Sequence, residues 1–571
     1  MKRKKEFIIV LISLLVIVLS VSVAYFTIRI LGTGKEISVD FADLKVIFTS
    51  GSGTINGTNI EPGWSSGENT FTVKNESNGT YKYNIIIKDL VNTFVTNGFL
   101  VYKITSTDGG YNMTDFADVP KSSTSADTVL AENISINKGA THTYKIEIKY
   151  LESSTINQDE DQGKKLSGKI FIEKAMPTLA SKILEDNPTI STRTDFSTPF
   201  TTNTVNTLYK TTENATDVYY FAGQDTESTP INNWVKFGKT NKNECTYNGN
   251  AVLYFDGTNV STIENESQCL SSKVCKLGNQ YGVGETVTED FCTSQGAEWT
   301  NQNAKWSTGT YNLYWRIIRT NADGSIRLLY HGTSTTATDA YIGTSAFNTN
   351  DNSPKYVGYM YGNTDATLEE ARTNANDSTI KAYIDNWYAN NMTSYTKYLS
   401  TTAVYCNDRE LASGASYSTT EKFYFKSLDR LDTNKTPTYD CTNNNDKFTV
   451  DASTGNGILT YPIALMTADE IAYAGGVYEQ NAPMWYYTNS SLKSSTGVLP
   501  WWSLSPGNWN GNKAISWFVD GSDNPGYLST FFVYPVIGVR PAVSLKSCIK
   551  YSTGNGTSET PYEIVETLSG C

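Results

Sequence analysis

The 571-residue sequence predicts a mostly β and α+β protein, with an N-terminal transmembrane helix, an antiparallel β-sandwich and then a larger α+β domain. Three observations predict this architecture. An apolar run near the N-terminus is long enough to cross a bilayer, and the stretch after it alternates apolar and polar residues in short runs. The remainder mixes strand patterns with helical ones and carries all of the cysteines.

The N-terminal segment combines a basic cluster with a long apolar run. Residues 1–6 contain Lys2-Arg3-Lys4-Lys5 and predict a cytoplasmic tail. Residues 7–31 follow as an anchor or signal segment, in which Phe7–Phe26 is interrupted only by serines. A run of about 20 residues spans about 30 Å as a helix, which favours an uncleaved anchor, although Ser22-Val23-Ala24 offers small residues at cleavage spacing. We therefore expect a single-pass protein of the cell membrane with the bulk of the chain extracellular.

Residues 38–175 contain no cysteine and alternate apolar and polar residues between Gly, Asn and Ser turns. This spacing predicts the antiparallel β-sandwich. The acidic triplet Asp159-Glu160-Asp161 suits either a solvated loop or a calcium contact. In residues 176–206, apolar side chains at helical spacing predict a short helix within Pro177–Asn187, and the Thr/Ser-rich remainder predicts a linker.

Residues 207–571 combine both periodicities and predict the α+β domain. Trp315–Ile318 and Ile326–Tyr330 flank a turn that ends in glycine, which predicts a hairpin. Ser378–Asn390 places its large apolar residues on one helical face. A second helix begins at the capping box Thr467–Glu470 and ends at a pair of glycines.

The cysteines predict a disulfide framework. Their number is even, the chain is expected to be exported, and no C-x-x-C spacing of a zinc site occurs. Local closure favours Cys548–Cys571, Cys406–Cys441 and two bridges within a predicted Cys-rich insertion at residues 240–305. The four cysteines of this insertion are Cys245, Cys269, Cys275 and Cys292.

Composition and motifs exclude several function classes. The net charge is −12 and basic residues cluster only in the first five positions, so nucleic acid is not an expected partner. The two histidines, His142 and His331, are far apart, and no hydrolase, Walker or dinucleotide-binding motif occurs. We therefore expect a protein that is not an enzyme and has no cofactor, leaving calcium at Asn443–Asp446 with Asp432 as the alternative to an Asx-rich turn.

The most informative stretch is Trp501–Leu545, where large aromatics stand among Asn, Ser, Asp and Gly. Rigid rings on polar loops supply contact area at low entropic cost, which is typical of binding surfaces, whereas alternate aromatics also line β-cores. We expect Trp501 and Trp502 in the core, and Trp509 and Phe532 at least about a third exposed on one face. The predicted ligand-binding residues are Trp509, Asn510, Asn512, Trp517, Tyr527, Phe531, Phe532 and Tyr534.

Motifs in the same region resemble a known family. Trp501–Gly507 and Gly538–Ala542, with Tyr314–Arg319, Ala340–Asn348 and Leu465–Ile471, are similar to a domain of unknown function common in exported proteins of gut Firmicutes. That domain looks related to the C-type-lectin-like and formylglycine-generating-enzyme fold. The resemblance implies a C-type-lectin-like domain over residues 207–571. Some lectin-like relatives are variable targets of diversity-generating retroelements, with binding residues in this C-terminal region.

The chain also departs from these relatives. The catalytic cysteine arrangement of formylglycine enzymes is missing, and so are the sugar-binding triplets of calcium lectins. Separately, Ala24-Tyr25-Phe26 followed by a β-rich segment is similar to camelysin and biofilm-fibre subunits, without the H-E-x-x-H of a metalloprotease.

The sequence therefore predicts a membrane-anchored bacterial cell-surface protein that binds an external protein or glycan through its C-terminal domain. A retroelement target is one form of this prediction. The alternative is a structural cell-surface or fibre subunit in which the β-sandwich is the working part, and an exported enzyme stands third.

Overall fold

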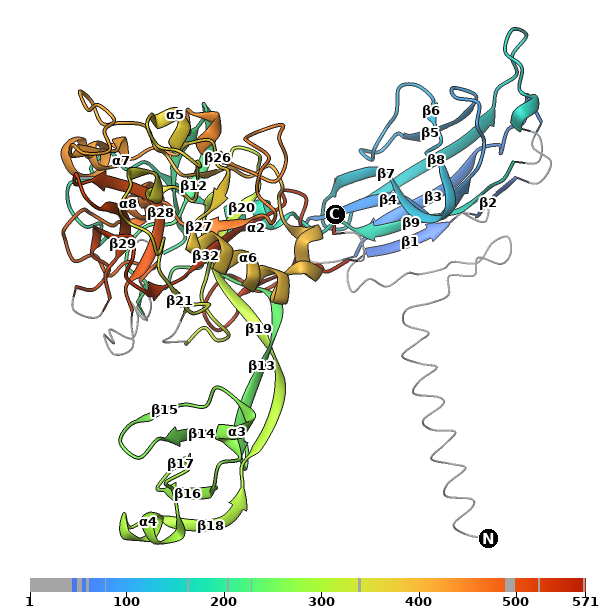
Figure 1. The fold of residues 1–571 in the computed structure, drawn as a ribbon. Coiled ribbons are helices and arrows are strands. Elements are labelled where there is room, and N and C mark those ends of the chain that lie inside the picture. The colour runs from blue at the N-terminus through green and yellow to red at the C-terminus, as the bar shows by residue number, and fades with distance from the viewer. Residues whose placement is uncertain are drawn as a thin grey trace, which may run out of the picture. The chain divides into compact units, whose positions relative to one another are not determined.

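The structure is a computed structural model that describes residues 44–48, 54–57, 61–76, 79–161, 164–202, 205–226, 228–336, 340–487, 499–521, 524–567 and 570–571. The predicted tail, residues 1–6, and the predicted transmembrane segment, residues 7–31, lie outside this set. Within it, no helix combines the length and apolarity that crossing a membrane requires. The chain divides into two compact units, Met1–Met176 and Pro177–Cys571 (Figure 1).

The first unit is a sandwich of two antiparallel sheets, as predicted. One sheet has the order β1-β3-β8-β5-β6 and the other β2-β9-β4-β7. Apolar side chains from both sheets form one core, because alternate residues of each strand point to the same face. The strands are β1 Leu44–Phe48, β2 Thr54–Gly57, β3 Asn69–Asn75, β4 Tyr81–Asn92, β5 Leu100–Ser106, β6 Ala117–Asp118, β7 Ser122–Ile136, β8 Thr141–Tyr150 and β9 Leu166–Lys174.

The acidic triplet forms the short 3₁₀ turn η1, Asp159–Asp161. The Asp161 carboxylate accepts hydrogen bonds from the N–H groups of Val95 at 2.6 Å and Thr96 at 3.2 Å, and from the Tyr150 hydroxyl at 2.9 Å. These donors hold its pKa below its ordinary value against the opposing effect of burial. The Asp161 carboxylate therefore anchors this loop through hydrogen bonds.

The second unit mixes helices with β-structure, and its largest sheet contains most of its strands. That sheet runs β10-β11-β12-β19-β13-β14-β17-β16-β18, with β20, β32 and β27 continuing from β19. Its strands are β10 Thr189–Ser191, β11 Thr207–Glu213, β12 Thr216–Tyr220, β13 Trp234–Tyr247, β14 Asn250–Phe255, β15 Val260–Thr262, β16 Lys273–Leu277, β17 Gln280–Val283, β18 Glu298–Asn303, β19 Lys305–Thr320, β20 Ile326–Tyr330, β27 Ile463–Leu465, β32 Pro541–Leu545, β33 Tyr551–Thr553 and β34 Tyr562–Ile564.

A second sheet of this unit carries the aromatic C-terminal stretch, in the order β21-β31-β28-β29-β30 with β25 paired to β28. Its strands are β21 Thr344–Ser345, β25 Phe423–Tyr424, β28 Trp501–Trp509, β29 Ala514–Val519, β30 Leu528–Phe532 and β31 Ile537–Gly538. Two small ladders pair β22 Met360–Tyr361 with β23 Asn376–Asp377, and β24 Tyr405–Cys406 with β26 Lys447–Phe448.

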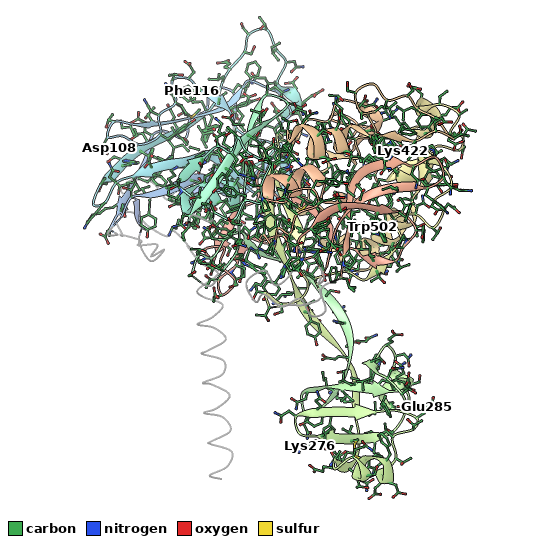
Figure 2. The ribbon with its side chains drawn as sticks, turned by 90° about the vertical axis from the view of Figure 1, so that its left-hand side faces the viewer. Asp108, Phe116, Lys276, Glu285, Lys422 and Trp502 are labelled. Atoms are coloured by element: carbon green, nitrogen blue, oxygen red, sulfur yellow. A yellow bond between two sulfur atoms is a disulfide. The ribbon has the colours of Figure 1, made fainter. Side chains whose placement is uncertain are left out.

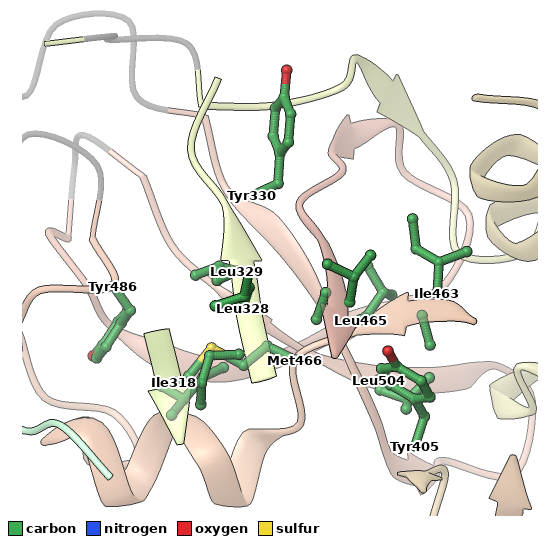
Figure 3. Close-up of a cluster of buried hydrophobic side chains, with 14 of the residues drawn as sticks. Ile318, Leu328, Leu329, Tyr330, Tyr405, Ile463, Leu465, Met466, Tyr486 and Leu504 are labelled. Carbon is green, nitrogen blue, oxygen red and sulfur yellow. The ribbon is translucent and has the colours of Figure 1, made fainter. Parts of the chain in front are cut away.

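The predicted hairpin and helices are confirmed. β19 and β20 pair from Trp315–Tyr330 to Thr320–Ile326, and Thr467 and Glu470 form both bonds of the capping box. Apolar side chains of these strands and helices meet in one core, part of which is drawn in Figure 3. The helices are α2 Leu179–Asp186, α3 Glu266–Cys269, α4 Glu289–Ser294, α5 Leu368–Ala371, α6 Thr379–Asn391, α7 Lys426–Leu428 and α8 Ala468–Ala474. The remaining turns are η2 Pro354–Val357, η3 Thr393–Tyr398, η4 Asp429–Asn434 and η5 Asn444–Asp446.

The segment predicted as a linker within residues 176–206 instead lies on the second unit. β10 pairs in parallel with β11, and the Arg193 guanidinium donates to the carbonyls of Ala472 at 3.3 Å and Tyr473 at 2.6 Å. The same guanidinium lies 4.2–4.6 Å from the ring centres of Phe196 and Phe200. A cation suits the carbonyl-rich C-terminus of α8. The sequence of this segment has no hydrophobic periodicity, because individual side chains such as Arg193 hold it in place rather than one apolar face.

The predicted Cys-rich insertion, residues 240–305, lies on and beyond the two-stranded ribbon of β13 and β19. β13 pairs with β19 out to Thr246–Lys305, and strands β14–β18 follow beyond this pair (Figures 1 and 2). One disulfide joins Cys245 of β13 to Cys269 of α3, and another joins Cys275 of β16 to Cys292 of α4. The four bridges of the chain are Cys245–Cys269, Cys275–Cys292, Cys406–Cys441 and Cys548–Cys571. All join near neighbours in sequence, which is why local closure predicted them.

Candidate ligand-binding surface

The strand that leads into the predicted ligand-binding residues, β28, is buried. Every residue of β28 is buried, and Trp501 and Trp502 are completely so, as expected. The indole N–H of Trp502 donates to the Ser345 carbonyl at 2.9 Å, which fixes the strand against β21. Pro506 lies where the pairing of β28 with β29 shifts register, so its missing N–H costs no regular ladder bond.

Trp509 and Trp517, both predicted to bind ligand, belong to the core. Trp509 is 1% exposed, so the expectation that a third of it faces solvent is wrong. It pairs with Phe423 of β25, which crosses the end of β28. The Trp517 indole is also buried and donates to the Ser427 hydroxyl at 2.9 Å. Phe423 and Ser427 come from one distant segment, residues 423–428, which local sequence around the tryptophans does not reveal.

Asn510 and Asn512 lie exposed at the tip of the β28–β29 hairpin. The Asn510 side-chain oxygen accepts the N–H groups of Asn512 at 3.0 Å and Lys513 at 2.7 Å, which closes the turn around Gly511 at φ +91°. Asn510 therefore shapes the tip. The amide of Asn512 and the ammonium of Lys513, 2.7 Å from Asp351, are the polar groups presented there.

Four aromatic rings form a partly exposed strip beside this tip. The aromatic strip consists of Phe518, Phe531, Phe532 and Tyr534, whose consecutive ring centres lie 5.4, 6.0 and 5.9 Å apart. Phe531 is 39% and Tyr534 48% exposed, while Phe518 and Phe532 are half-buried. The Lys513 ammonium lies 5.7 Å from the Tyr534 ring centre and joins the strip to the hairpin tip.

Tyr527 lies at the opposite end of β30 from Tyr534. Burial, together with the nearby carboxylates of Glu479 and Asp520, raises its pKa above the ordinary value. The structure thus brings Asn510, Asn512, Phe531, Phe532 and Tyr534 together, and it separates Tyr527 and the two tryptophans from them.

Sequence reasoning missed a charged pocket beneath α8. The Arg319 guanidinium forms a two-bond contact with Glu213 at 3.0 Å and a 2.9 Å bond with Glu470, which also binds Arg327 at 3.0 Å. Burial by itself would raise the pKa of Glu470. The charges of Arg327 and Arg319 outweigh this effect and hold the pKa below its ordinary value. No local motif could have found this cluster, because its members are far apart in sequence.

A second group of charged residues lines the same pocket. Arg430 makes a two-bond contact with Asp469 at 2.8–3.0 Å and a 2.6 Å bond with Asp408. Carboxylates therefore engage the arginines of this pocket, and its chemistry is that of a structural ion network. The full set of lining residues is Arg319, Arg327, Val404, Cys406, Asp408, Arg430, Thr438, Tyr439, Asp440, Thr467, Asp469, Glu470 and Ser505.

The calcium alternative at Asn443–Asp446 is not supported. The buried carboxylate of Asp446 accepts the Nε–H of Arg409 at 2.7 Å and its main-chain N–H at 2.9 Å. Asp432 is half-exposed and lies 3.9 Å from Lys435. Across the residues that the structure describes, no three His, Cys, Asp or Glu side chains gather as a metal site would require.

Both histidines are buried. His331 packs edge-on against Trp234 with ring centres 4.4 Å apart, and burial lowers its pKa well below the ordinary value. In the first unit, His142 Nδ1 shares a 2.8 Å hydrogen bond with the Tyr83 hydroxyl, which in turn contacts that of Tyr144. Burial lowers the pKa of His142, against the opposing attraction of Asp108.

Comparisons with known proteins bear on none of these residues. The chain matches no protein-family model, no curated protein and no solved structure.

Proposed function

We propose that this chain is a membrane-anchored bacterial cell-surface protein that binds an external protein or glycan through the aromatic strip of its second unit. The exposed rings of Phe531 and Tyr534 carry the proposal. Large rings that stand in solvent beside Asn and Lys side chains supply contact area at low entropic cost, and binding surfaces use them for that reason.

The surroundings of the strip support the same function. β28 is buried along its whole length, and four disulfides staple the unit. A disulfide framework suits an oxidising extracellular environment. The rings therefore project from a rigid frame, which lowers the entropy lost when a ligand binds.

The alternative of a fibre subunit requires the β-sandwich to offer a pairing edge. Strand β7 is an edge of its sheet, but its pairing with β4 shifts register four times. It also carries exposed polar side chains, Asp127, Glu132 and Asn133 among them. Bulges and charges are the features by which sheet edges avoid pairing, so β7 is not suited to pair with a strand of another subunit.

The test compares variants of the full chain on an array of bacterial and host glycans and a panel of purified extracellular proteins. We expect Phe531→Ala and Tyr534→Ala to weaken binding of a captured ligand at least about tenfold, with melting temperatures close to that of the unmodified chain. Phe116→Ala is the matched control, because Phe116 is 37% exposed but lies on the first unit. Equal binding by all variants, or no ligand for the unmodified chain, would contradict the proposal.

The surrounding DNA tests the retroelement form of the proposal. A near-copy of the DNA that encodes Trp501–Pro541, differing only at adenines and lying beside a reverse-transcriptase gene, would identify a diversified binder. Without such a copy, a fixed binder and a structural role remain the two alternatives.

A further inference from the structure

Strand β30 has a definite hydrogen-bonding direction. It pairs with β29 in regular antiparallel register, from Val519–Leu528 to Ile515–Phe532. Just outside the strand ends, the Val533 N–H donates to Ala514 at 3.1 Å and the Asp520 N–H donates to Tyr527 at 2.8 Å. Because hydrogen-bonded pairs alternate along an antiparallel ladder, the main-chain groups of Ser529 and Phe531 face β29.

The main-chain groups of Leu528, Thr530 and Phe532 consequently face away from β29. The contact of Leu528 confirms this direction, since its carbonyl accepts the Glu479 N–H at 2.9 Å from the other side. For Thr530 and Phe532, the part of the chain that the structure describes supplies no main-chain partner. Both residues are partly exposed, and the Tyr478 side chain contacts that of Thr530.

We infer that this edge binds an extended segment of a partner polypeptide, which adds a strand to β30. The inference rests on the proposed function and names its ligand class. Donors and acceptors that repeat every second residue, about 6.6–6.8 Å apart, match the main chain of another strand. The hydroxyl groups of a glycan have no such repeat.

The side chains and charges around the edge indicate which residues the partner segment should contain. Phe531 and Tyr534 flank the open groups and would cover apolar side chains of the added strand. At the Leu528 end, Glu479 is exposed and forms no ion pair with any described residue. The ammonium of Lys513, near the Tyr534 end, is already neutralised by Asp351. The edge therefore fits a segment with alternating apolar residues and a Lys or Arg beside Glu479.

Proline substitution separates strand addition from other contacts. Thr530→Pro removes an N–H that lies outside the β29 ladder, so the β29–β30 pairing keeps its hydrogen bonds while the edge loses one of its two donors. It also removes the side-chain contact with Tyr478. Thr530→Ala is the matched control, because it removes the same side chain and keeps the N–H. Glu479→Lys is a second variant that changes no main-chain group.

The probes are pools of nine-residue fluorescent peptides with Thr at alternate positions, varied apolar residues between them and a terminal Lys or Glu. Binding to the full chain is followed by anisotropy, and hydrogen exchange is measured at the amides of Thr530 and Phe532. We expect saturable binding by the Lys pools, at least tenfold weakening by Thr530→Pro and less than twofold by Thr530→Ala. Glu479→Lys should reverse the preference to the Glu pools, and bound peptide should slow exchange at both amides.

Three results would overturn the inference: no saturable binding by any pool, equal binding by the proline and alanine variants, or unchanged exchange at the two amides. Concentration-dependent dimerisation that Thr530→Pro abolishes would assign the edge to a second copy instead. If a ligand found on the arrays depends on Tyr534 but tolerates Thr530→Pro, the binding surface stands and strand addition fails. The failures of the two proposals are thereby distinguishable.

Discussion

Replacing Glu470 by glutamine tests the buried ion network of the second unit. The substitution keeps the size of the side chain but removes the charge that lies 2.9 Å from Arg319 Nε and 3.0 Å from an Arg327 terminal nitrogen. Arg319 keeps Glu213, whereas no other described carboxylate pairs with Arg327, which is 1% exposed. Leaving a buried cation without its partner costs about 3–5 kcal/mol.

The change in melting temperature follows from this free-energy loss and the melting entropy of the unit. Melting entropy is about 2.1 cal/mol/K per residue, so Pro177–Cys571 has about 0.83 kcal/mol/K in total. A loss of about 3–5 kcal/mol therefore lowers the melting temperature by about 4–6 °C. Differential scanning calorimetry of the full chain measures this shift.

An exposed ion pair of the same unit provides the control. Lys276 and Glu298 are 3.0 Å apart, and both are more than a third exposed. Exposed pairs contribute little, so Glu298→Gln should move the melting temperature by less than about 1 °C. A Glu470→Gln protein that melts within 1 °C of the unmodified chain would refute the reasoning that this network holds the unit together.

Three further predictions concern the core, the last disulfide and pH. Trp517→Ala should cost about 3–5 kcal/mol in urea unfolding because the ring is fully buried, whereas Phe531→Ala should cost well under half of that; similar losses would place both rings in one environment. Cys571→Ser opens a loop of 23 residues and should cost about 3 kcal/mol, and peptide mapping of the unmodified protein without reductant should find Cys571 linked to Cys548 rather than alkylatable. The pKa of His142 is lower in the folded than in the unfolded chain, so the stability it contributes is present above about pH 6.5 and is lost as the pH falls through that value. The urea midpoint of the first unit should therefore fall between pH 7.5 and 5.5, and an equal fall in His142→Gln would assign the effect to other groups.

Patterns within short stretches of sequence predicted much of the fold. The alternation of residues 38–175 predicted the sandwich, and the capping box at Thr467 predicted the start of α8. The disulfide Cys548–Cys571 followed from closure over a short loop. These features depend on neighbours along the chain, so the sequence alone contains their determinants.

Only the tertiary structure decided which aromatics are exposed. Trp509 stands between two asparagines and is buried, whereas Phe531 stands among Thr, Phe and Val and is 39% exposed. Arg193 and the network of Glu213, Arg319 and Glu470 likewise join segments more than 100 residues apart. Burial depends on which distant segment packs against a side chain. Periodicity along one strand carries no information about that partner, and this is the physical reason that the sequence did not predict which aromatics of the Trp501–Leu545 stretch are exposed.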